Sequence, residues 1–181
     1  MALTIQLPSH RAQVKFNLRR WAELLADREL AKIEGRIETD RHGHIIMSPP
    51  PGAFHGGCQF EVGHLLGTLM PGGRVITVCP ISTADGVRAA DVVWISRARL
   101  RGQPLHVCLT RAPEICVEVL SPSNTKREIA EKFALYFEAG AEEAWVCRKD
   151  GGMEFHLAGE SAPVAASLLC PAFPQRVKLA S

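Results

Sequence analysis

An apolar run with one interior acid dominates the pattern in the second half of the chain. Residues 114–120 read EICVEVL. A segment that is apolar on both faces is typical of a strand covered on both sides. Glu118 interrupts this segment, and an ionised carboxylate is costly there unless a cation, a metal ion or hydrogen-bond donors meet it. The pattern therefore predicts a central strand whose acid is either ion-paired or functional.

A turn and a helix are predicted to follow this strand, over residues 121–140. Thr125 and Glu128, three residues later, have the spacing of a capping box. Apolar side chains then recur at helical intervals, and Gly140 favours a left-handed helix end. These apolar side chains are Ile129, Phe133, Tyr136 and Phe137.

The first half of the chain begins without a strong pattern. Residues 1–15 are expected to be an extended arm, followed by a short helix with Asn17 as its N-cap and Trp21 on its apolar side. Three prolines at 49–51 predict a stiff loop, and a second helix is expected at 55–69. Its apolar side is expected to contain Phe60, Leu65, Leu66 and Leu69.

Short apolar or alternating segments predict the remaining strands. They are expected at residues 33–38, 44–47, 74–78, 91–96, 105–109, 143–148 and 153–157. Residues 97–104 are expected to be a basic loop. No repeat or linker divides these elements. The sequence therefore predicts a single α/β domain over residues 16–181, with a mixed central β-sheet flanked by helices.

Composition narrows the function classes only slightly. At 181 residues the chain can bury a sizeable core, and its formal charge of +2 makes no case for or against nucleic-acid binding. No apolar stretch approaches the roughly 20 residues of a membrane span. The first residues lack the pattern of a signal peptide, so a cytoplasmic protein is expected, with its six cysteines reduced and buried.

Two acids and a lysine form the candidate chemistry. Asp91 opens the strand predicted at 91–96, and its carboxylate can converge with that of Glu118 if the two strands are neighbours. Two facing acids require a proton or a cation between them, and an oxygen-only site suits Mg²⁺ or Mn²⁺. A nearby ammonium would offset charge on a phosphorane. Lys132 borders the apolar helix stripe and is the best-placed candidate, with Lys126 as a second.

The same residues also have structural interpretations. Asp91 could be satisfied by a turn, Glu118 by a salt bridge, and Lys132 by water. A serine hydrolase using Ser121 or Ser123 is not favoured, because no GxSxG elbow is present.

Three segments resemble the Uma-type family of restriction endonucleases, which belongs to the PD-(D/E)XK nuclease superfamily. The segments are IEGRIETDRHGHIIMSPPPGAFHG, CPISTADGVRAADVVWISRARL and APEICVEVLSPSNTKREIAEKFALYFEAGAEEAWV. The resemblance implies a restriction-endonuclease-like fold and a Mg²⁺-dependent endonuclease that hydrolyses DNA phosphodiester bonds. It implies that Asp91 and Glu118 bind the metal ion, with Lys132 as a lysine moved from the strand to the helix. It also matches Glu34 to an acid of the first hairpin and His55 to a histidine after the proline loop.

The chain departs from the family pattern at three positions. Ala90 replaces a proline before the strand acid, Leu120 stands two residues after Glu118 where a lysine is usual, and Val78 stands where an acid is common. These departures keep a second hypothesis open. The protein could be a catalytically degenerate module that binds nucleic acid or a protein partner.

The expected partner is DNA. Three basic clusters could contact phosphates or simply be solvated: Arg19 with Arg20, Arg97 with Arg99 and Arg101, and Lys126 with Arg127. Analogy with double-strand cutters adds a homodimer as an expectation.

Overall fold

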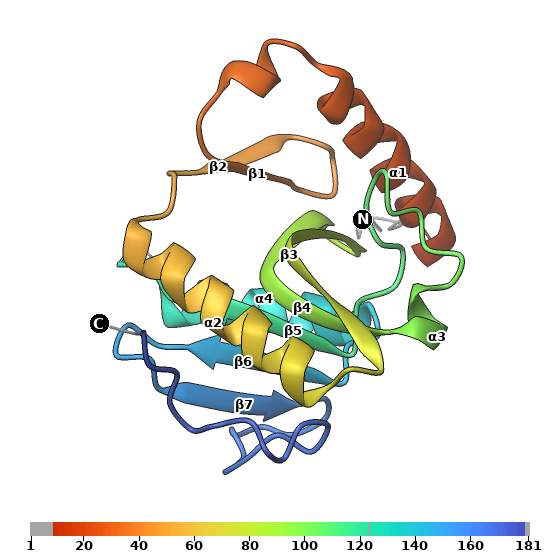
Figure 1. Cartoon of the computed structure of the whole chain (residues 1–181). Coiled ribbons are helices and arrows are strands. Elements are labelled where there is room, and N and C mark those ends of the chain that lie inside the picture. Colours follow the sequence, from red (N-terminus) through yellow and green to blue (C-terminus); the bar gives the residue numbers. More distant parts are fainter. Residues whose placement is uncertain (1–8, 123, 180–181) are drawn as a thin grey trace, which may run out of the picture.

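The computed structural model describes residues 9–122 and 124–179 (Figure 1). Its elements in chain order are α1 (His10–Ala26), η1 (Leu30–Lys32), β1 (Arg36–Thr39), β2 (Ile45–Ser48), α2 (Ala53–Leu69), β3 (Gly73–Thr83), β4 (Gly86–Ser96), α3 (Arg97–Leu100), β5 (Ile115–Val119), α4 (Lys126–Glu138), β6 (Glu143–Cys147) and β7 (Met153–Leu157). None of the described helices is both long and apolar enough to cross a membrane.

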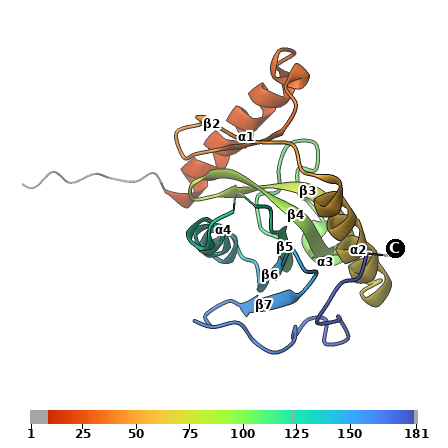
Figure 2. The same cartoon turned by 90° about the vertical axis from the view of Figure 1, so that its left-hand side faces the viewer.

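The central sheet has five strands in the order β3-β4-β5-β6-β7, and β1 and β2 form a separate hairpin. β5 and β6 are parallel, while the other neighbours are antiparallel, so the predicted mixed sheet is confirmed. Figure 2 shows α4 and α2 on opposite sides of this sheet. All five residues of β5 are buried, as expected for a strand covered on both faces.

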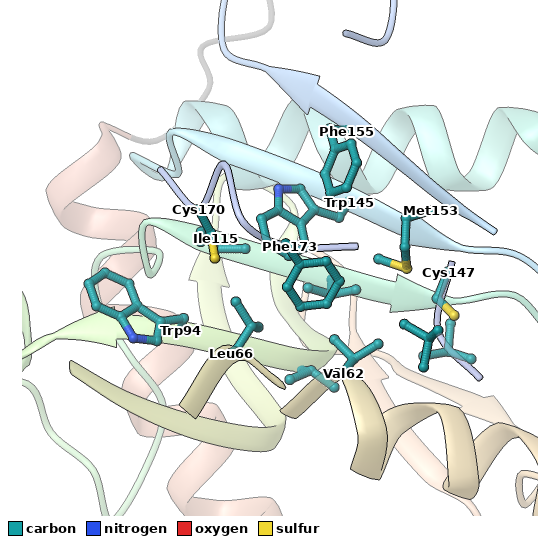
Figure 3. Packing of buried hydrophobic residues seen from close by; sticks show 14 of the residues in the cluster. Val62, Leu66, Trp94, Ile115, Trp145, Cys147, Met153, Phe155, Cys170 and Phe173 are labelled. Atoms are coloured by element: carbon teal, nitrogen blue, oxygen red, sulfur yellow. The ribbon is translucent and has the colours of Figure 1, made fainter. Parts of the chain in front are cut away.

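Aromatic rings fill the core on the α2 side of the sheet. The ring centroid of Trp145 lies 5.0 Å from that of Phe155 and 4.8 Å from that of Phe173 (Figure 3). Val62 and Leu66 of α2 are fully buried in the same cluster. This packing fixes the position of α2, whose N-terminal end carries part of the candidate site.

The apolar side predicted for α2 was partly wrong. Its buried residues are Cys58, Val62, Gly63 and Leu66, whereas Phe60 is 66 % exposed and stacks on His64. Gly63 lies on the buried side instead. A Cβ on Gly63 would lie 3.3 Å from Val75, so the helix approaches the sheet closely at this glycine.

The N-terminal prediction also needs correction. α1 begins at His10, with the Ser9 side chain accepting a hydrogen bond from the backbone N–H of Ala12, so residues 10–15 are helical. The rest of the predicted arm, residues 1–8, lies outside the described residues. Asn17 is not an N-cap but a buried residue inside the helix. Its amide donates to Ser82 Oγ, Thr83 O and Gly86 O, which fixes α1 against the β3–β4 turn.

Several strand boundaries differ from the prediction. β3 and β4 each have 11 residues, so Asp91 lies in the middle of a strand rather than at its start. In the described chain, residues 105–109 form no strand but a single bridge between Leu109 and Ile81. The segment after β4 starts with the one-turn helix α3 instead of a loop.

Local signals were more reliable in the second half of the chain. The Thr125–Glu128 capping box is present, and Gly140 has a φ of +103°. All six cysteines are free and buried, as predicted.

Candidate active site

The two predicted acids lie on neighbouring strands. Val92 pairs with Val117, and Asp91 and Glu118 each lie one residue beyond this pair, in opposite chain directions. Their exposed fractions are 2 % and 3 %. Burial raises the pKa of Glu118 against the opposing charge of Lys132, and the charge of Asp91 raises it further. The two carboxylates are therefore close enough to influence each other's ionisation.

Asp91 is held by three donors. Arg36 contacts Oδ1, and the backbone N–H of Val119 donates to Oδ2 at 2.7 Å. Nε2 of His55 lies 3.3 Å from the same Oδ2. Burial alone would raise the pKa of Asp91, but the hydrogen bond from His55 and the charge of Arg36 lower it below the usual value. Asp91 is thus an ionised, firmly oriented carboxylate.

Glu118 is met by two side chains of α4. Lys132 Nζ lies 3.0 Å from Oε2, and the Tyr136 hydroxyl donates to Oε1 at 2.6 Å. Burial and the neighbouring charge of Glu118 raise the pKa of Tyr136 well above its ordinary value, so the phenol remains a donor. Burial opposes the charge of Lys132, yet Glu118 and Glu38 together raise the pKa of its ammonium.

A third acid, Glu38, completes the cluster. Its Oε1 lies 3.0 Å from Lys132 Nζ and accepts from the backbone N–H of Ala89 at 2.9 Å. Burial opposes ionisation, but the charge of Lys132 lowers the pKa of Glu38. Arg88 reaches Glu38 at 3.5 Å and Asp85 at 2.6 Å. Lys132 therefore bridges two buried carboxylates.

Two predicted site residues lie outside this cluster. Glu34 is exposed and precedes β1, so the hairpin acid that reaches the site is Glu38. Lys126 is exposed at the first position of α4, so Lys132 is the lysine that joins the acids. The sequence analysis missed Arg36 and Glu38. Both alternate with Glu34 on one face of the predicted strand, and that shared face was the available signal.

His55 sits at the edge of the cluster near the start of α2. Its Nδ1 is buried and has no hydrogen-bond partner among the described residues. One turn later, Gln59 donates to the backbone carbonyl of Asp91 at 2.8 Å. The N-terminal part of α2 therefore holds both the side chain and the backbone of Asp91.

A pocket of about 530 Å³ opens beside Asp91. Its walls include the three prolines 49–51, His55 and Val78. Val78 faces Asp91 in the β3–β4 ladder, between the pairs Thr77–Val92 and Cys79–Ala90. Its φ is +49°, a conformation that is strained for a β-branched residue, and its side chain is 49 % exposed. The strained residue thus lines the pocket directly opposite the acid.

A second pocket, of about 570 Å³, lies on the α4 side of the cluster. Arg36, Ser48, Pro49 and Asn124 line both pockets. The second pocket is also lined by Glu128, Glu131 and Glu138 of α4. Arg36, Arg41, Arg88 and Lys132 line the same pocket, so its charge is mixed.

The basic clusters differ in their surroundings. Arg99 is tied to Glu114 at 3.3 Å and to Glu142 at 2.6 Å, and its side chain is buried, so it is a structural residue. Arg97 and Arg101 are exposed and line a hollow of about 500 Å³ together with Arg74. Neither Arg74, Arg97 nor Arg101 forms an ion pair with another described residue.

The donor types of the acid pair fit a hard divalent cation, since Asp91 and Glu118 offer carboxylate oxygens. In this conformation each of the four oxygens already has a protein partner. Within residues 9–122 and 124–179, no three His, Cys, Asp or Glu side chains are grouped so that they could hold a metal ion. A metal ion would therefore share these oxygens with the present donors or displace one of them.

Comparison with known families decides the classification. The chain matches the Uma2 family, described as "Putative restriction endonuclease", over residues 21–175. This protein belongs to the Uma2 family. The resemblance seen in the sequence is therefore confirmed. A comparison with curated proteins found no match.

One solved structure supports the fold of this Uma2 protein. It is the crystal structure of a putative nuclease belonging to DUF820 from Anabaena variabilis ATCC 29413. The TM-score is 0.64 at 15 % sequence identity, over 83 % of this chain and 92 % of that chain. At that identity the likeness establishes the fold, and the predicted restriction-endonuclease-like architecture is confirmed.

Proposed function

We propose that this Uma2 protein is a metal-dependent endonuclease that hydrolyses DNA phosphodiester bonds at the Asp91–Glu118 pair. One observation carries the proposal. Two buried carboxylates lie at adjacent positions of neighbouring strands, with Lys132 3.0 Å from Glu118 and a pocket beside Asp91. Burying such a group costs free energy. Membership of a family described as restriction endonucleases supports a catalytic role for it.

Asp91 and Glu118 would hold the metal ion, Mg²⁺ or Mn²⁺. When bound, such an ion polarises a phosphoryl oxygen and lowers the pKa of its water. Lys132 is anchored by Glu38 and would stabilise negative charge on the phosphorane. His55 borders the pocket and would donate to a phosphate oxygen or accept a proton there. Glu34 has no part in this proposal.

The runner-up, a degenerate module that binds nucleic acid or a protein partner, has its own support. The four carboxylate oxygens are already satisfied by protein donors, and Leu120 occupies the usual lysine position. A closed ion-pair network of this kind can be purely structural.

Calorimetric titration with Mn²⁺ and Mg²⁺ separates the two functions, with and without double-stranded DNA. The variants are Asp91→Ala and Glu118→Ala, and Glu34→Ala is the matched control because Glu34 is an exposed acid outside the cluster. The nuclease proposal expects metal binding that both site variants lose and the control retains. It also expects Mg²⁺-dependent cleavage of plasmid DNA by the wild type and the control, and loss of cleavage in both site variants. No binding by the wild-type protein, even with DNA present, would leave the degenerate module as the better function.

A further inference from the structure

Arg36 is a partly exposed cation that contacts one of the candidate metal ligands, Asp91. It is the first residue of β1, its side chain is 21 % exposed, and its guanidinium contacts Oδ1 of Asp91. Burial lowers its pKa, but the charges of Asp91, Glu118 and Glu38 raise it above the ordinary value. Arg36 also lines both pockets, so it stands where they meet.

The charges of the cluster are nearly balanced in the free protein. Three carboxylates, Glu38, Asp91 and Glu118, face two cations, Arg36 and Lys132, which leaves one negative charge. Arg88 also reaches Glu38, but its charge is offset by the shorter contact with Asp85. A divalent ion would turn this into one positive charge in a buried site. A phosphodiester brings the single negative charge that restores neutrality. The balance therefore favours a metal ion and a phosphate together over a metal ion alone.

Arg36 and a metal ion compete for the same oxygen. A guanidinium and a divalent cation that both contact Asp91 Oδ1 would lie a few ångströms apart, where like charges repel strongly at low dielectric. Asp91 Oδ2 already has two contacts, the Val119 N–H and His55, whereas Oδ1 has the Arg36 contact. Movement of Arg36 away from Oδ1 would therefore favour Asp91 as a ligand.

Of the two cations, Arg36 is held by fewer acceptors. Lys132 has three acceptors, Glu38, Glu118 and the carbonyl of Ala89, and lies on the packed helix α4. Arg36 belongs to the separate β1–β2 hairpin, and its long side chain reaches the wall of the pocket beside Asp91. A planar guanidinium is also the side chain best suited to bind a phosphate through two parallel hydrogen bonds.

We propose that Arg36 is a phosphate-binding residue that serves as the counter-ion of Asp91 until DNA arrives. This inference rests on the proposed nuclease function. When DNA binds, the guanidinium passes from Asp91 to the phosphate, and the freed carboxylate accepts the metal ion. Metal and DNA binding are therefore linked, and each raises the affinity for the other by the same factor.

The test is Mn²⁺ calorimetry on wild type, Arg36→Met and Arg36→Gln, each with and without a short double-stranded oligonucleotide. In wild type, DNA should raise Mn²⁺ affinity by about tenfold, a typical coupling. Without DNA, both Arg36 variants should bind Mn²⁺ about tenfold more tightly than wild type, and DNA should add little. Their DNA affinity, measured by fluorescence anisotropy, should fall. Arg148→Met is the control, because Arg148 pairs with Asp150 and Glu154 and belongs to none of the candidate basic clusters, and it should behave as wild type.

The outcomes separate this inference from the proposed function. If wild type binds Mn²⁺ through Asp91 equally well with and without DNA, and the Arg36 variants do the same, the nuclease site stands and the counter-ion role is wrong. If neither wild type nor the variants bind Mn²⁺ under any condition, the proposed function fails and this inference fails with it. Two variants of different polarity, with thermal melting of each, distinguish a charge effect from misfolding.

Discussion

The ammonium of Lys132 lies 3.0 Å from the carboxylate of Glu118, so a helix supplies the cation for an acid in the central strand. Related nuclease sites were expected to have a lysine in the strand itself, at the position that is Leu120 here. The helix stripe that carries Lys132 also carries Tyr136, and both reach the same carboxylate. Lys132 of the helix therefore takes the place in space of the lysine expected in the strand, although it lies at a different position in the sequence.

Lys132→Met should abolish most of the DNA cleavage predicted for the wild type. Without the ammonium, the already raised pKa of Glu118 should rise further, which favours the protonated carboxyl over the carboxylate. We expect a loss of about 100-fold, as for other residues that stabilise charge in a transition state, with partial recovery at higher pH. The measurement is the pH profile of plasmid cleavage.

Lys126→Met is the matched control for this prediction. Lys126 is exposed at the first position of the same helix, so its replacement should leave the profile unchanged. Equal decreases in the two variants would show that overall charge, rather than the Lys132–Glu118 ion pair, is responsible.

The two candidate metal ligands should differ in their effect on stability. The fold lowers the pKa of Asp91, so it favours the ionised form, whereas it raises the pKa of Glu118 and disfavours ionisation. Asp91→Asn should therefore lower the free energy of unfolding at pH 7, on the order of 3 kcal/mol, because Arg36 loses its partner. Glu118→Gln should change it by less than about 1 kcal/mol, since Lys132 keeps Glu38 as a partner and an uncharged amide avoids the cost of a buried charge. Urea denaturation measures both.

The same pKa directions predict how this difference varies with pH. The contribution of Asp91 is present above its ordinary pKa of 3.8 and is lost as the pH falls through its lower folded value. The unfavourable contribution of Glu118 appears as the pH rises from its ordinary pKa of 4.5 toward its higher folded value. The difference in free energy of unfolding between Asp91→Asn and Glu118→Gln should therefore become smaller as the pH falls. A gap that stays constant down to acid unfolding would contradict the assignment of these ionised forms.

Local sequence signals predicted one part of the site well. The strand around Glu118, the Thr125–Glu128 capping box and the helix carrying Lys132 are neighbours in sequence, so propensity and periodicity were sufficient. Asp91 was placed at the start of its strand because the apolar run VVWI follows it, and Arg88 to Ala90 were left outside the strand. In the structure they extend β4 and help to bind Glu38.

The remaining part of the site depends on contacts between distant segments. Glu34, Arg36 and Glu38 share one face of an alternating segment, so periodicity alone cannot select among them. The choice is made by the pairing of Arg36 with Ser48 at the start of β1 and by the hydrogen bond between Glu38 and the Ala89 N–H. These are tertiary contacts, and nothing local in the sequence specifies them.

Val78→Asp should strengthen the metal site. Val78 faces Asp91 across the ladder, lines the same pocket and has a φ of +49°. Asp tolerates this conformation better than a β-branched residue, and relief of strain is worth about 1 kcal/mol. The new carboxylate would add an acid beside Asp91. We expect tighter Mn²⁺ binding by calorimetry, with stability equal to or above that of the wild type.

Val78→Asn is the control for the backbone effect. Asn tolerates the same φ but brings no charge, so it should match the gain in stability without the gain in Mn²⁺ affinity. If both variants bind Mn²⁺ alike, a carboxylate at position 78 does not reach the ion.

DNA binding should depend on the hollow lined by Arg74, Arg97 and Arg101. These arginines are exposed and form no ion pair with other described residues, and Leu100 and Leu105 line the same hollow. Replacing all three with Ala should weaken DNA binding and reduce the slope of log affinity against log salt, by about 0.9 for each phosphate that the protein no longer neutralises. Anisotropy titrations at several salt concentrations measure both quantities.

Arg19→Ala combined with Arg127→Ala is the control for this triple variant, because each of those arginines is paired with a glutamate on its own helix. A paired arginine has its charge already offset by its neighbour, so it should add little to the attraction of a phosphate backbone. The double variant should therefore keep the wild-type salt slope. A slope that falls equally in the control would mean that net charge, and not this hollow, attracts the DNA.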